Sequence, residues 1–191
     1  MKGDRIMRRI LTWATLALVT PIAVLGIYLG FLRASGNFHE VLPGQLYRSA
    51  QPTPGQLARY IQRYGIKTVI NLRGPSEQKW YRDEVATTSR LAIQHLDFRM
   101  TASRQLSDGE SEELIALMKD APKPLLIHCK AGADRTGLAS VIYLQQVAGV
   151  DEETAEWQLS PLYGHVALPF LRAYAMDRSW LSLEHLLGIE T

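Results

Sequence analysis

Apolar positions alternate between helical and strand spacing along most of this chain. Apolar residues recur every three or four positions, as on one face of a helix, in 54–65, 76–91, 107–119, 138–149 and 168–187. Short apolar runs typical of buried strands lie between them, at 66–72, 93–97 and 124–127. Because helices alternate with strands, we predict an α/β fold with a central, mostly parallel sheet flanked by helices.

Capping signals support these boundaries. Thr53 precedes Pro54, a combination typical of a helix start, and Gly65 follows the last apolar position of that helix. Ser107 and Glu110 have the spacing of a capping box before the helix 107–119. Asp151 is in turn predicted to cap a short helix that ends near Pro161.

The N-terminal pattern is different, because residues 10–32 are apolar and hold no charged side chain. About 20 apolar residues suffice to cross a bilayer as a helix. Residues 1–9 hold four basic side chains and one acidic one, and such basic flanks stay in the cytoplasm. We therefore expect an uncleaved single-pass membrane helix at 10–32, a linker at 33–40 and a globular domain at 41–191 outside the cytoplasm, in the periplasm of a Gram-negative bacterium. A cleaved signal peptide is the alternative.

The net charge of +2 does not indicate a nucleic-acid-binding protein, since it comes from the basic N-terminal flank. Without residues 1–9 the chain has 17 basic and 18 acidic side chains. The charges are segregated, with ten basic and four acidic residues in 41–105 and six basic and thirteen acidic residues in 106–191. The basic half could steer an anionic substrate toward a binding site.

The strongest chemical signal is the sequence HCKAGADRTG at 128–137, between the predicted strand 124–127 and the next helix. Unpaired backbone N–H groups and the positive end of the helix dipole converge there, and both favour a bound anion. The guanidinium of Arg135 can add two parallel bonds to a phosphate. This electropositive setting favours the thiolate of Cys129, which is the nucleophilic form. The loop calls for no metal, and we expect no cofactor.

This motif resembles the signature of the cysteine-dependent protein tyrosine phosphatase superfamily, in its compact dual-specificity branch. The runs LYRSAQP at 46–52 and NLRG at 71–74 resemble small bacterial members, so the resemblance covers about 41–149. It implies that 41–191 is a phosphatase domain, in which Cys129 attacks phosphorus to form a cysteinyl phosphate. It also implies that Arg135 binds the phosphate and that Thr136 can hydrogen-bond the sulfur. The phosphate-binding loop would comprise Lys130, Ala131, Gly132, Ala133, Asp134 and Arg135.

The resemblance also implies a general acid on a loop about thirty residues before the cysteine. Asp97 has this position at the end of the predicted strand 93–97, and Asp108 is the reserve candidate. The carboxylate of Asp134 is expected to point away from the phosphate, into a structural hydrogen bond with neighbouring backbone. Lys130 either adds charge at the rim or is solvated, and Arg73 either lines the pocket or forms a salt bridge.

The substrate remains open between a phosphorylated protein and a phospholipid or inositol phosphate, with membrane attachment favouring the lipid. Lys130 matches phosphoinositide 3-phosphatases, but Ala133 stands where they carry a second basic residue. A catalytically silent phosphate-binding module is the alternative of a different class. Its discriminating feature would be loss of the nucleophile or the acid, and both candidates are present.

Overall fold

The computed structural model describes residues 2–188, and for residues 2–6 and 8–10 the backbone alone. Two compact units form, Met1–Ser35 and Gly36–Thr191. In the first, the helix α1 (Lys2–Ser35) includes the stretch Leu11–Ser35, which is long and apolar enough to cross a membrane. An N-terminal signal sequence would have the same length and composition. The basic side chains predicted to orient this segment lie outside the described side chains.

The second unit is built on a five-stranded sheet in the order β1-β2-β5-β3-β4. The strands are β1 (His39–Leu42), β2 (Leu46–Ser49), β3 (Thr68–Asn71), β4 (Gln94–Asp97) and β5 (Leu125–His128). Only the β1–β2 pair is antiparallel among them, so the prediction of an α/β fold with a mostly parallel sheet is confirmed. Each parallel strand is reached through a helical connection, as parallel pairing requires.

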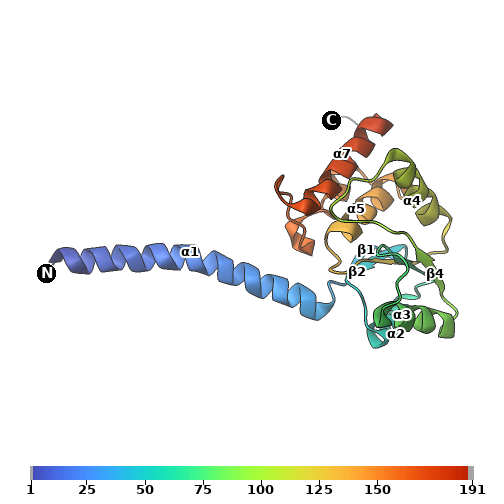
Figure 1. Cartoon of the computed structure of the whole chain (residues 1–191), viewed down its shortest axis with the longest axis horizontal. Coiled ribbons are helices and arrows are strands. Elements are labelled where there is room, and N and C mark those ends of the chain that lie inside the picture. Colours follow the sequence, from blue (N-terminus) through green and yellow to red (C-terminus); the bar gives the residue numbers. More distant parts are fainter. Residues whose placement is uncertain (1, 189–191) are drawn as a thin grey trace. The chain divides into compact units, whose positions relative to one another are not determined.

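Helices cover both faces of this sheet (Figure 1). One face carries α2 (Pro54–Tyr64) and α3 (Lys79–Arg90). The other carries α4 (Asp108–Asp120), α5 (Asp134–Ile142) and α7 (Ala175–Leu187). The strand residues alternate between two buried apolar clusters, for example Leu126 on the α2 side and Ile127 on the α5 side. β5 is buried along its whole length, and the candidate site begins where β5 ends.

Local signals set the helix ends as expected in several places. Thr53 and Ser107 each form a complete capping box, and Asp151 accepts a hydrogen bond from the Thr154 N–H at the start of α6 (Glu152–Glu156). The helix that starts at Asp134 continues as a π-helical turn, η1 (Tyr143–Val147), and stops before Gly149, whose φ of 68° is left-handed.

Several predicted boundaries differ from the structure. The stretch 33–40, expected to be a linker, holds the end of α1 and the first residues of β1, whose pairing with β2 is a tertiary contact invisible in local patterns. The last helix begins at Ala175 instead of 168, because Pro169 interrupts the pattern and the chain forms turns and the 3₁₀ helix η3 (Arg172–Tyr174) first. The short helix after Asp151 ends at Glu156, well before Pro161, which opens the 3₁₀ helix η2 (Pro161–Tyr163).

Candidate active site

The predicted phosphate loop lies where β5 ends and α5 begins. Cys129 follows β5 directly and is 2% exposed. The backbone N–H of Gly132 donates a hydrogen bond to the Cys129 Sγ at 3.3 Å. The loop therefore curls around the sulfur and directs at least one main-chain donor at it, as an anion-binding loop does.

Gly132 permits this curl. Its φ is +71°, and a Cβ at this position would lie 2.5 Å from the Ala50 nitrogen and 2.6 Å from the Ser49 carbonyl carbon. Both the left-handed backbone and the close approach to the end of β2 therefore require glycine.

A buried arginine holds the loop from behind. Arg48, on β2, is fully buried, and its Nη2 donates to the carbonyls of Gly132 at 2.8 Å and Ala133 at 3.3 Å. Its Nη1 donates to the backbone and side-chain oxygens of Gln158. Burial lowers the pKa of Arg48 to about 10, an effect that Tyr163 and Cys129 oppose. Arg48 thus remains charged at neutral pH and binds two carbonyls of the loop.

Arg135 occupies the first turn of α5 and is half-buried. Its Nη1 donates to the carbonyls of Leu72 at 3.4 Å and Met100 at 3.3 Å, in the segments that follow β3 and β4. Both bonds are long, so an incoming phosphate with charged oxygens can replace them. The Thr136 hydroxyl is buried and has no hydrogen-bond partner among the described residues, so the expected bond to Cys129 Sγ is not formed here.

Asp97 ends β4, at the same sheet edge as the loop but with β3 in between. Its Oδ1 accepts from Asn71 Nδ2 at 2.7 Å and its Oδ2 accepts from the Tyr81 hydroxyl at 2.5 Å. The bond to Asp97 raises the pKa of Tyr81 to about 12. An acid role for Asp97 therefore needs one of these two bonds to open. The reserve candidate, Asp108, lies on the exposed first turn of α4.

A buried carboxylate contacts histidines of both β4 and β5, and the sequence alone did not predict it. Glu84, on α3, lies with Oε1 2.7 Å from His95 Nε2 and Oε2 3.1 Å from His128 Nε2. Gln51 also donates to Glu84 Oε2. Burial alone would raise the pKa of Glu84, but His128, with His95 and Gln51, lowers it to about 2. The histidine before Cys129 is thus paired with a carboxylate that is ionised at neutral pH.

The remaining predicted residues lie at the rim or turn away. Lys130 and Ala131 are exposed, and Ala133 is buried. Arg73 forms no salt bridge, as far as the described side chains show. It stacks on Trp80, with its guanidinium carbon 3.4 Å from the ring centre, and donates to Gln51 Oε1. Burial lowers the pKa of Arg73, and the charge of Arg135 lowers it further, so the two guanidinium groups share one region.

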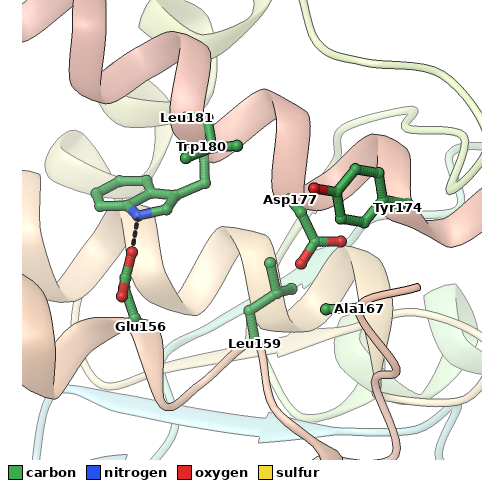
Figure 2. A pocket seen from close by; sticks show the side chains of 7 residues that line it. All are labelled: Glu156, Leu159, Ala167, Tyr174, Asp177, Trp180 and Leu181. Carbon is green, nitrogen blue, oxygen red and sulfur yellow. Dashed lines mark hydrogen bonds between the residues drawn. The ribbon is translucent and has the colours of Figure 1, made fainter. Parts of the chain in front are cut away.

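A separate hollow of about 360 Å³ lies between residues of α6, α7 and the segments that connect them (Figure 2). Its lining residues are Glu156, Leu159, Ala167, Tyr174, Asp177, Trp180 and Leu181. None of the residues predicted for the active site lines it. The hollow is therefore distinct from the loop in which the sequence predicts the chemistry.

Comparison with known proteins agrees with this geometry. Residues 29–163 match the tyrosine phosphatase family, and this stretch includes the whole loop. The chain belongs to that family. It is 30% identical over 121 residues to the dual specificity protein phosphatase TpbA of Pseudomonas aeruginosa, a match that covers 62% of this chain. The chain spans about half the length of the curated relatives it matches.

Solved structures of tyrosine phosphatase family proteins share the fold. The structure of P. aeruginosa TpbA with a cysteine-to-serine change, in complex with phosphotyrosine, matches with a TM-score of 0.59 and 26% identity, over 78% of this chain and 91% of that one. Tk-PTP in its active form matches with a TM-score of 0.62 and 17% identity, over 78% and 97% of the two chains, which supports the fold alone. The resemblance found from the sequence motif is therefore confirmed at the level of the family.

Proposed function

We propose that this protein hydrolyses phosphate monoesters, with phosphotyrosine in proteins as the substrate class. The observation that carries the proposal is the buried Cys129 Sγ inside a loop whose Gly132 N–H points at it, with Arg135 in the first helical turn that follows. The relative TpbA, solved with phosphotyrosine, supports the choice of substrate.

The chemistry takes two steps. The Cys129 thiolate attacks phosphorus in line, so that an S–P bond forms while the P–O bond to the leaving group breaks. Arg135 and the loop N–H groups bind the three equatorial phosphoryl oxygens, over which the charge is spread in the transition state. A water then attacks phosphorus and breaks the S–P bond, which releases phosphate and restores the thiolate. Asp97 gives its proton to the leaving oxygen in the first step and takes one from water in the second.

A substrate comparison tests this proposal. The full chain in detergent is assayed side by side on phosphotyrosine and phosphoserine peptides, phosphatidylglycerophosphate and phosphoinositides. We expect phosphotyrosine to be hydrolysed with the highest kcat/KM. Preference for a lipid would contradict the proposed substrate class but agree with phosphomonoester hydrolysis. Hydrolysis of none of these esters would contradict the proposed reaction itself.

Asp97→Asn should lower kcat by about 10²-fold or more for aryl phosphates with poor leaving groups, because a general acid contributes about 10²–10⁴-fold. Substrates whose leaving groups depart without a proton should be hydrolysed by Asp97→Asn at nearly the rate of the unsubstituted protein. The measurement is the slope of log kcat against leaving-group pKa for both proteins. If Asp108→Asn steepens the slope and Asp97→Asn does not, the acid is Asp108.

We further infer that α1 anchors the domain to a membrane, with the domain outside the cytoplasm. The support is the apolar stretch Leu11–Ser35, preceded by four basic residues. Alkaline phosphatase is a reporter that is active only when it folds in the periplasm. Fused after Thr191, it should be active. Activity of a cytoplasm-dependent reporter at the same position would reverse the topology.

A further inference from the structure

A buried histidine, which the sequence analysis did not single out, contacts the phosphate loop. His165 is fully buried in the segment between η2 and η3. Its Nδ1 lies 2.8 Å from Asp134 Oδ1, and its Nε2 lies 3.0 Å from Asp177 Oδ2 and 3.2 Å from Asp177 Oδ1. Asp134 therefore bonds a side chain 31 positions away in sequence, and not the neighbouring backbone as expected.

The two contacts determine the charge of the ring. An ionised carboxylate only accepts hydrogen bonds, and a neutral imidazole carries only one N–H. Both ring nitrogens can donate to both carboxylates only if the ring is an imidazolium. The charged groups that face the ring are Asp134 from α5 and Asp177 from α7. Burial lowers the pKa of His165, but the hydrogen bonds and charges of the two aspartates outweigh it, so that the pKa is raised above 6.5.

The ring is held in place by its own segment. The His165 N–H donates to the Ser160 carbonyl, and Asn37 Nδ2 donates to the carbonyls of both Tyr163 and Ala131. Asp177 projects from α7 toward the segment that holds Ala167 (Figure 2). Hydrogen bonds thus hold the backbone around His165, and the Asp177 carboxylate contacts the ring on the side away from Asp134.

Asp134 lies where its contact with His165 can affect anion binding. Asp134 is the first residue of α5 and directly precedes Arg135. Backbone N–H groups at a helix start bind anions, so a free carboxylate there would compete with a phosphate and repel it. The bond to His165 turns this carboxylate away from the N–H groups and fixes the backbone next to Arg135.

We propose that His165, as an imidazolium between Asp134 and Asp177, is a positioning residue that keeps the phosphate loop in its anion-binding form. This inference rests on the proposed function, since it assigns the loop an anion. Because the pKa of His165 is raised, its paired hydrogen bonds to Asp134 and Asp177 are fully present below pH 6.5. They are lost as the pH rises through the folded-state pKa of His165. Anion affinity should therefore fall as the pH rises above 6.5 and through this pKa.

The test measures binding of tungstate, a stable phosphate-like dianion, by calorimetry. The full chain carries Cys129→Ser, so that thiol ionisation cannot contribute, and is compared with and without His165→Gln from pH 6.5 to about 9. In the parent, the affinity should fall by about tenfold over this range. With His165→Gln it should be about tenfold weaker at pH 6.5 and should no longer fall with pH.

Three further measurements keep the outcome decisive. His185→Gln, which changes a histidine on α7 outside this contact, should leave the pH dependence of the parent unchanged. If His165→Gln fails to fold, Asp177→Asn is measured instead, and its loss of affinity should occur at a lower pH because one carboxylate is missing. An unchanged pH dependence in either variant, or its loss in His185→Gln, overturns the assignment. Turnover by the Cys129-containing chain is scored separately, so that failure of hydrolysis counts against the proposed function alone.

Discussion

Cys129→Ser should lower kcat for an aryl phosphate by about 10⁴-fold or more while phosphate-like anions still bind. A serine hydroxyl has the shape of the thiol but is not ionised at neutral pH. In the described part of the chain, the hydrogen bond to the Cys129 Sγ comes from the Gly132 N–H, a donor that cannot take its proton. Glu84, the buried carboxylate beside His128, is already held by His95, His128 and Gln51. The variant therefore keeps the anion-binding loop and loses the nucleophile.

Two measurements check this result independently. Tungstate titration of the variant should give an affinity within a few-fold of the parent, which shows that the loop is intact. Because the chain holds one cysteine, alkylation by iodoacetate reports on Cys129 alone and should be slowed by bound phosphate. Substantial hydrolysis by Cys129→Ser, or alkylation unaffected by phosphate, would count against a sulfur nucleophile.

The sequence identifies the part of the site whose chemistry is local. HCKAGADRTG contains a strand end, a turn and a helix start within ten residues, so Cys129, Gly132 and Arg135 lie in one short segment. The capping box at Ser107 and the capping role of Thr53 are likewise confirmed, because each cap has its partner three residues away. Such features can be predicted without knowing the tertiary packing.

What the sequence does not predict is the set of charged side chains that support the loop from a distance. Arg48 reaches Gly132 across 84 positions, and Glu84 and His165 reach the loop from a helix and an irregular segment with no motif of their own. The one available signal for Arg48 is a basic residue inside the run LYRS, whose members are all buried. A charge in a buried strand needs a partner, but the pattern does not tell which carbonyl or carboxylate supplies it.

Gly132→Ala should lower kcat/KM by about 10²-fold or more, since small displacements of reacting groups have effects of this size. The added Cβ would overlap the backbone of Ser49 and Ala50, which cannot move aside as a flexible side chain could. The loop must then shift, and the shift withdraws the Gly132 N–H from Cys129 Sγ and the Gly132 carbonyl from Arg48 Nη2. The variant therefore loses both an anion-binding N–H donor and the contact of the loop with Arg48.

Gly44→Ala is the matched control, because the backbone strain is the same and the collision is absent. Gly44 has a φ of +69° in the turn between β1 and β2, and nothing lies within 4 Å of its added Cβ. Its substitution should cost stability of about 1 kcal/mol and leave kcat/KM within about twofold. Thermal unfolding and kcat/KM are measured for both variants. Equal losses of activity would mean that left-handed strain, and not the close approach to β2, explains the glycine in the loop.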